Sequence, residues 1–261
     1  MEMEDKEQLW IESPNGWGAQ DEQEKDNDND GGLIDLFETD PNEDFAFHIR
    51  INTNTTKTIC LRGFKLDSEE TDRSTGVTLW KASPRLAKYL QENSVVCKGK
   101  SVLELGAGLG LCGITAHYLG AKSMLMTDAD TQTLQKMREN VRQNCPLGDV
   151  ITTTNNPAID CRQLMWGSPH MEKFSEHEKY DTILGADVIY THGSIQPLFD
   201  TVAFLLMKPH GIFILSRYTK WNGVDDAVVI EAAKSRCLDC DRTSEGIFLF
   251  RWNENESKRS G

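Results

Sequence analysis

VLELGAGLG, residues 102–110, is a short apolar run that ends in glycine at every second position. An apolar pattern with helical spacing begins directly afterwards, at Leu111. A strand that enters a helix through a glycine-rich turn is typical of open parallel sheets, in which ligands bind outside the carboxyl ends of the strands. Glycine adopts positive φ at little cost and lets the backbone approach a ligand closely. The stretch therefore predicts an α/β fold with a ligand site at residues 106–110.

Strand and helix patterns alternate along the chain around this turn. Further strands are predicted at 123–127, 150–154, 180–186 and 211–216, and a loop that contains Trp166 is predicted after residue 154. Helices are predicted at 83–92, 111–119, 131–143, 194–207 and 224–235. A hairpin within 45–61, an extended piece at 75–80 and an antiparallel pair at 237–242 and 246–252 complete the prediction. This alternation indicates a mostly parallel sheet with helices on both faces.

The negative charge of the chain is concentrated at its N-terminal end. Residues 1–44 hold 16 Asp and Glu but 2 Lys and Arg, whereas the remainder holds 25 acidic and 26 basic residues. The segment DEQEKDNDNDGG (21–32) cannot bury enough apolar surface to offset its chain entropy. We therefore predict a disordered acidic tail at 1–44, a folded domain at 45–254 and a polar tail at 255–261. The folded domain has no basic stripe, which argues against a nucleic-acid partner.

Composition also limits the compartment and the class of protein. No run of 18 apolar residues is present and the chain starts MEMED, so neither a membrane span nor a signal peptide is predicted. The seven cysteines are irregularly spaced, and the single CxxC (237–240) has no second pair to complete a zinc site. We expect free thiols, no bound metal and a cytoplasmic location, with the nucleus open. A monomer is expected because no exposed apolar helix stripe stands out.

Two cofactors compete for the glycine-rich turn. Asp128 follows the next predicted strand, at the point where a carboxylate can bind the two hydroxyl groups of a ribose. The dinucleotide fingerprint GxGxxG requires glycine where Leu111 stands. Glu104, two residues before the first glycine, is badly placed beside a pyrophosphate but suits the ammonium group of S-adenosylmethionine. The residues therefore favour S-adenosylmethionine over a nicotinamide cofactor.

Five stretches in order resemble the class I, seven-β-strand methyltransferases. They are TGVTLWKAS (75–83), VLELGAGLGLCGI (102–114), TDAD (127–130), LMWG (164–167) and LGADVIY (184–190). More narrowly, they resemble the protein-lysine methyltransferase subgroup that includes the methyltransferase-like 21 proteins, over about residues 45–252. The resemblance implies a Rossmann-like fold with a seven-stranded sheet, S-adenosylmethionine as cofactor, and methyl transfer to a lysine of a protein substrate.

The resemblance also implies cofactor-binding residues. Trp80 packs beside the methionine end of the cofactor, Asp128 binds the ribose hydroxyls, and Trp166 borders the adenine. The amino-acid and ribose region is lined by Glu104 and by residues of the turn, and Ala186 packs nearby. The expected cofactor-binding set is Trp80, Glu104, Gly106, Ala107, Gly108, Asp128, Trp166 and Ala186.

Asp187 and Tyr190 are the catalytic pair that the resemblance implies, beside the target amine. Asp187 can attract the lysine and accept a hydrogen bond from its amine, while Tyr190 forms a wall of the lysine channel. A plain structural role for Asp187, at the end of a strand, stays open. Thr78, Arg217 and Tyr218 are weaker candidates for the rim of the substrate pocket.

Alternative functions also stay open at this point. One alternative is a methyltransferase that acts on another nitrogen nucleophile. The other is a non-catalytic adaptor that keeps the methyltransferase fold. A nicotinamide oxidoreductase is disfavoured by Glu104 and Leu111. By resemblance, chaperones and translation elongation factors are the first candidates for the protein substrate.

Overall fold

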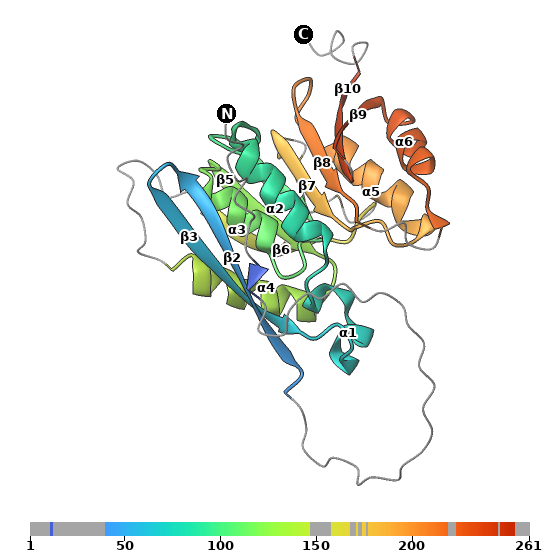
Figure 1. Ribbon diagram of the computed structural model, residues 1–261. Coiled ribbons are helices and arrows are strands. Elements are labelled where there is room, and N and C mark those ends of the chain that lie inside the picture. Colours follow the sequence, from blue (N-terminus) through green and yellow to red (C-terminus); the bar gives the residue numbers. More distant parts are fainter. Residues whose placement is uncertain are drawn as a thin grey trace, which may run out of the picture.

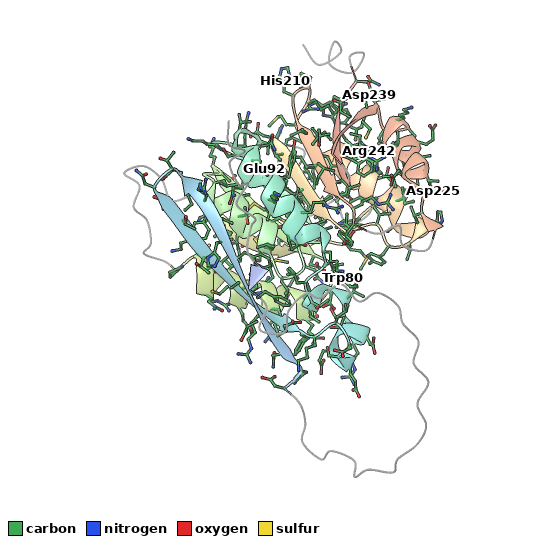
Figure 2. All side chains as sticks on the ribbon, in the orientation of Figure 1. Trp80, Glu92, His210, Asp225, Asp239 and Arg242 are labelled. Carbon is green, nitrogen blue, oxygen red and sulfur yellow. The ribbon has the colours of Figure 1, made fainter. Side chains whose placement is uncertain are left out.

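The computed structural model describes residues 11–12, 40–146, 158–167, 171, 174–175, 177–218, 223–244 and 246–253. In this part of the chain a seven-stranded sheet is covered by helices on both faces (Figure 1), and Figure 2 shows the side chains in the same orientation. Its strands are β4 (Ser101–Leu105), β5 (Ser123–Asp128), β6 (Ala158–Gln163), β7 (Thr182–Ala186), β8 (Ile212–Ser216), β9 (Leu238–Ser244) and β10 (Ile247–Trp252). The helices are α1 (Glu69–Arg73), α2 (Ala82–Glu92), α3 (Leu111–Tyr118), α4 (Thr131–Asn144), α5 (His192–Leu205) and α6 (Asp226–Lys234).

The strand order of this sheet is β6-β5-β4-β7-β8-β10-β9. The first five strands in that order are parallel, and β10 lies antiparallel between β8 and β9. The chain runs from β4 outward to β6 and then returns to β7 on the other side of β4, so the order reverses between β4 and β7. The predicted mostly parallel α/β fold is confirmed, and the reversal marks the edge at which such sheets bind ligands.

Successive residues of the central strand β4 face opposite sides of the sheet, as the strand period requires. Leu103 and Leu105 are buried in one cluster with side chains of α5 and α6. Val102 is buried in a second cluster with side chains of α2, α3 and α4. Glu104 lies on this second side, so its carboxylate is directed towards α3 instead of α5.

An antiparallel hairpin, β2 (Asn42–Asn52) and β3 (Thr55–Phe64), forms a third layer outside α3 and α4 (Figure 1). Phe45, Phe47 and Leu61 on its buried face join a cluster with Leu111 and Ile114 of α3. The two-residue strand β1 (Ile11–Glu12) pairs with β2 opposite Ala46 and Phe47. The predicted hairpin is therefore confirmed, with its first strand beginning at Asn42 instead of Phe45.

The structure differs from the prediction at three other places. Residues 75–77, expected to be extended, form a 3-10 turn, and α1 before them was not predicted. The expected strand at 150–154 lies outside the described residues. Strand β6 at 158–163 falls within the predicted loop. Its sequence AIDCRQ is short and carries charged residues, as edge strands often do, so it gives little apolar signal. The predicted tails lie outside the described residues except for 11–12 and 40–44.

Two further properties concern the environment of the protein. Among the described residues, no helix is both long and apolar enough to cross a membrane. The seven cysteines lie in the described part of the chain, and no disulfide joins them there. Cys97 and Cys112 are buried, and burial raises the pKa of the Cys97 thiol to about 12.

Candidate functional site

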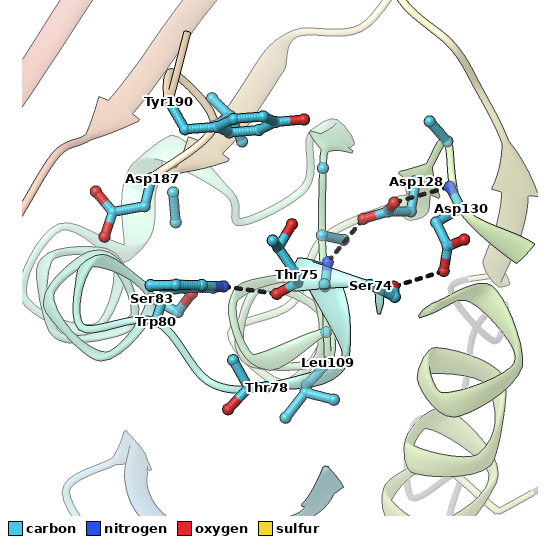
Figure 3. A pocket seen from close by; sticks show the side chains of 18 of the residues that line it. Ser74, Thr75, Thr78, Trp80, Ser83, Leu109, Asp128, Asp130, Asp187 and Tyr190 are labelled. Atoms are coloured by element: carbon cyan, nitrogen blue, oxygen red, sulfur yellow. Dashed lines mark hydrogen bonds between the residues drawn. The ribbon is translucent and has the colours of Figure 1, made fainter. Parts of the chain in front are cut away.

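A pocket of about 630 Å³ opens at the carboxyl ends of β4, β5 and β7. Figure 3 shows it from close by, with Asp128 and Asp130 on one side and Trp80, Asp187 and Tyr190 on the other. The structure brings all but one of the ten predicted site residues to its wall: Trp80, Gly106, Ala107, Gly108, Asp128, Trp166, Ala186, Asp187 and Tyr190. The pocket therefore collects residues from five separate stretches of sequence.

The glycine-rich turn between β4 and α3 forms one wall of the pocket. Gly106, Gly108 and Gly110 have φ values of 61°, 54° and 92°, a region that side chains other than glycine rarely adopt. A Cβ atom at Gly106 would lie 2.9 Å from Val188 and 3.3 Å from the Trp166 ring. At these three positions the turn thus presents backbone alone to the pocket, which is what close approach of a ligand requires.

Asp128 ends β5 on one side of the pocket. Its carboxylate accepts hydrogen bonds from the backbone N–H groups of Gly108, at 3.2 Å, and Asp130, at 3.1 Å. Burial raises the pKa of Asp128 above its usual value, and these backbone donors oppose that rise. The carboxylate is therefore fixed beside the glycine-rich turn, where it can accept hydrogen bonds from the vicinal hydroxyls of a ribose.

The segment 74–80 forms a second wall, which sequence reasoning identified only at Trp80 and Thr78. The Trp80 indole donates a hydrogen bond of 2.7 Å to the carbonyl of Thr75. The Ser74 hydroxyl donates to Asp130, whose carboxylate also caps α4 by accepting from the Thr133 N–H. An Asp directly before a helix signals such a cap. The bond between Asp130 and Ser74 joins residues 56 positions apart, so no local sequence pattern reveals it.

Asp187 follows β7 on the opposite side of the pocket from Asp128. Its φ of 51° is positive, a conformation in which Asp and Asn are enriched among residues other than glycine. Its carboxylate accepts the N–H of Tyr218 at 2.9 Å and a backbone hydrogen bond from Ala82 at the start of α2. Burial raises the pKa of Asp187, and the two backbone donors oppose that rise. The carboxylate is thus held in place by backbone groups of two other segments.

Tyr190 and Trp166 line the pocket from two different loops. The Tyr190 side chain is 49% exposed, so its ring lies at the mouth of the pocket. Trp166 lies on the loop after β6, which is anchored by a hydrogen bond from the Leu164 N–H to the Asp128 carbonyl. Figure 3 shows the Tyr190 ring on the same side of the pocket as Asp187. An exposed aromatic ring on the same side as a half-buried carboxylate suits an entering cationic side chain.

Glu104 is the predicted site residue that is not part of the pocket wall. Its side chain is 2% exposed, and its Oε2 atom has no hydrogen-bond partner within the described part of the chain. Burial raises the pKa of Glu104 to about 8, and the Gly113 N–H at the start of α3 opposes that rise. The carboxyl group therefore lies beneath the glycine-rich turn, and direct contact with a cofactor stays a prediction.

The weaker rim candidates divide between the pocket and the core. Thr78 lines the pocket. Arg217 does not: it is 5% exposed and donates to Asp226 at 2.7 Å and to the Val224 carbonyl at 2.9 Å, which fixes the start of α6. Tyr218 is exposed, and the guanidinium of Arg85 lies 4.7 Å from its ring centre. In the described residues, no group of three acidic, cysteine or histidine side chains is arranged to hold a metal ion.

Residues 63–228 match the lysine methyltransferase family, which is nearly two thirds of the chain. The chain belongs to the lysine methyltransferase family. It is 34% identical over 145 residues to EEF1A lysine methyltransferase 3 of Xenopus tropicalis, covering 56% of this chain and 59% of that protein. It is 37% identical over 139 residues to protein N-lysine methyltransferase METTL21A of the same species, covering 53% and 59%. The chain thus spans less than two thirds of these two relatives.

A third relative aligns over more of its length. EEF1A lysine methyltransferase 3 of Mus musculus is 30% identical over 195 residues, covering 72% of this chain and 78% of that protein. Among solved structures, a putative RNA methyltransferase of Pyrococcus horikoshii, PH1948, superposes with a TM-score of 0.50 at 13% identity, covering 74% of this chain and 93% of that chain. At this identity the superposition shows a common fold and carries no information on substrate.

Proposed function

We propose that this chain is an S-adenosylmethionine-dependent methyltransferase that modifies a lysine side chain of another protein. Family membership supports the proposal. The observation that carries it is the placement of two fixed carboxylates on opposite sides of one glycine-lined pocket, Asp128 beside the turn and Asp187 beside Tyr190. One side suits the ribose of the cofactor, and the other suits a cationic amine.

The residues of the pocket fit the proposed cofactor. Gly106 and Gly108 line the pocket with backbone where a Cβ atom would crowd neighbouring residues, and the orphaned Oε2 of buried Glu104 is an acceptor beneath the same turn. Trp80, the glycine-rich turn and Asp128 would hold S-adenosylmethionine, which supplies an electrophilic methyl group when bound. The methyl is already activated, so the protein has to position the nucleophile, a contribution of up to about 7–11 kcal/mol.

The remaining residues act on the incoming lysine. A free lysine amine has a pKa near 10.4 and so arrives as an ammonium ion, which must lose a proton before it can attack. The Asp187 carboxylate attracts this ion and accepts a hydrogen bond that aims the amine. Because two backbone N–H groups already bind this carboxylate, its role is orientation more than strong base catalysis. Exclusion of water by Trp80 and Tyr190 lowers the pKa of the amine.

Translation elongation factor EEF1A is the protein substrate we propose to test first, because two relatives are named for methylating it. A second nucleophile, a protein N-terminal amine, is suggested by a Neurospora crassa relative that is 28% identical and is named protein N-terminal and lysine N-methyltransferase efm7. To distinguish the two, a substrate carrying an N-terminal tag is reductively methylated, which blocks its lysines and its N-terminal amine. A protease then removes the tag and exposes the native N-terminal amine. Incorporation of methyl groups into the cleaved sample but not into the uncleaved one would identify the N-terminal amine, and not lysine, as the nucleophile.

Titration calorimetry with S-adenosylhomocysteine tests the proposal directly. The wild-type protein should bind it, NADH should not bind, and Asp128→Ala should bind at least tenfold more weakly because the ribose acceptor is lost. A tritiated-methyl assay with purified EEF1A and with cell lysate then tests turnover. A folded wild-type protein that does not bind the ligand would overturn the proposal, and binding without any turnover would indicate a non-catalytic adaptor.

We also propose that the protein is cytoplasmic, with the nucleus as an alternative, and monomeric. Seven free thiols fit a reducing compartment. The large exposed hydrophobic residues of the described part are distributed over separate elements, for example Leu66, Val95, Met165 and Val228, instead of forming one stripe. A tagged full-length chain imaged in cells tests the compartment, and multi-angle light scattering tests the mass.

A further inference from the structure

Asn140 of α4 connects the hairpin to the glycine-rich turn. Its side chain is 1% exposed. Its Oδ1 accepts the Arg62 N–H at 2.9 Å, and its Nδ2 donates to the Arg62 carbonyl at 3.3 Å and to the Leu109 carbonyl at 3.1 Å. Arg62 belongs to β3, and Leu109 lines the pocket within the turn. One buried amide therefore binds backbone groups of two segments that are 47 residues apart in sequence.

Asn144, one helical turn further along α4, makes a matching set of bonds that stops short of the pocket. Its Oδ1 accepts the Cys60 N–H at 2.8 Å, and its Nδ2 donates to the Cys60 carbonyl and to the Asn140 carbonyl, both at 2.7 Å. The two side chains pair with the outer edge of β3 as a neighbouring strand would. Both make three bonds to backbone groups, and only Asn140 reaches the glycine-rich turn.

Gly63 provides a second contact between the hairpin and the turn. A Cβ atom at this position would lie 2.6 Å from the Leu109 side chain and 2.7 Å from the Val77 carbonyl. No side chain fits there, so β3 packs directly on the turn and on the 74–80 wall of the pocket. The packing is contiguous with the Asn140 bonds, since Arg62 and Gly63 are adjacent. The hairpin thus touches the pocket wall from behind at two points.

We infer that Asn140 is a positioning residue for the cofactor-binding turn, and that through it the β2–β3 hairpin is an energetic part of the cofactor site. This inference rests on the proposed cofactor. The Leu109 carbonyl is fixed by Asn140, and the Gly110 N–H that follows it is bonded to the Ala107 carbonyl, so the bond holds the turn in shape. Coupling of this kind is reciprocal: the hairpin strengthens cofactor binding, and cofactor binding stabilises the hairpin.

Asn140→Ala and Asn144→Ala form the matched test on the full chain. Each variant loses three side-chain bonds to backbone, so similar decreases in thermal midpoint are expected. Calorimetry with S-adenosylhomocysteine should show a dissociation constant raised about fivefold or more in Asn140→Ala, and within about twofold of wild type in Asn144→Ala. Equal affinities in the two variants, whether lowered or not, would overturn the inference.

If Asn140→Ala does not fold, hydrogen exchange of the wild-type protein tests the coupling between the hairpin and the cofactor site. The Arg62 amide is bonded to Asn140 and the Cys60 amide to Asn144. Saturating S-adenosylhomocysteine should slow exchange of the Arg62 amide more than that of the Cys60 amide. Equal or absent protection would overturn the inference. Failure of the wild-type protein to bind the ligand at all would instead count against the proposed function.

Discussion

The carboxylate of Asp187 and the backbone N–H of Tyr218 are hydrogen-bonded at 2.9 Å, although 31 residues separate them. The same carboxylate accepts a backbone hydrogen bond from Ala82. The end of β7, the start of α2 and the segment after β8 therefore meet at one side chain beside the pocket. The bonds that join these segments also fix the carboxylate beside the pocket, so a structural role for Asp187 is compatible with the steering role proposed for it.

Three substitutions of Asp187 separate its backbone conformation from its hydrogen bonds. Asn keeps both the tolerance of positive φ and one acceptor oxygen, Gly keeps only the tolerance, and Ala keeps neither. We expect the free energy of urea unfolding to fall least for Asp187→Asn and most for Asp187→Ala, with about 1 kcal/mol of strain in the latter. Methyl transfer should be lost in all three. A wild-type rate in Asp187→Asn would show that the negative charge is not needed.

Gly106→Ala should abolish cofactor binding. The new Cβ atom would lie 2.9 Å from Val188, at a φ of 61°. Calorimetry with S-adenosylhomocysteine checks the affinity, and Gly99→Ala is the control because that residue has a φ of 71° and no atom within 4 Å of the added Cβ. Both variants should be destabilised by the backbone conformation, but only Gly106→Ala should lose the ligand. Loss of binding in both would point to a general effect of instability.

Glu104 makes the folding stability depend on pH. Its folded pKa of about 8 lies above the ordinary value of 4.5 because the side chain is buried. Between these values the native state holds a proton that the unfolded chain releases, so this group makes stability fall as pH rises, by at most about 1.4 kcal/mol per pH unit. Urea unfolding from pH 5 to 8.5 should show this slope reduced in Glu104→Gln. An unchanged slope would mean that Glu104 is ionised in the native protein.

Arg217 is predicted to stabilise the fold without contacting substrate. Its side chain is 4% exposed, and it binds Asp226 at 2.7 Å. Arg217→Ala removes this buried pair and the bond to the Val224 carbonyl, while Asp226 keeps a second ion pair with Arg242 at 3.3 Å, so the free energy of unfolding should fall by about 2–3 kcal/mol. The exposed pair Arg251–Asp241 gives the control, since Arg251→Ala should cost less than about 1 kcal/mol. Similar small losses in both variants would contradict the structural role.

The features that sequence predicted well are those with a local cause. The turn at 106–110 needs glycine for its φ values. The elements β4, α3 and β5 around it are mostly apolar and were predicted to within one residue of their observed bounds. Contacts between residues far apart in sequence leave no pattern in the sequence around either residue. The bond from Ser74 to Asp130 and the bonds of Asn140 are contacts of this long-range type, so they were not predicted. Strand β6 was missed because an edge strand needs little apolar sequence.

Strand β10 is the last of the sheet in sequence, but it lies between β8 and β9. Its Phe250 ring stacks on Phe213 of β8 at 5.6 Å and meets Phe199 of α5 edge-on at 5.3 Å. A chain emerging from the ribosome therefore cannot cover this aromatic cluster until residue 250 has been made. Strand β8 pairs with β7 on one side, and its other edge, next to the Asp187 side of the pocket, stays unpaired until then. The nascent protein should consequently depend on chaperones for most of its synthesis, and a stop codon placed before β10 should yield an aggregating product instead of a weakened enzyme.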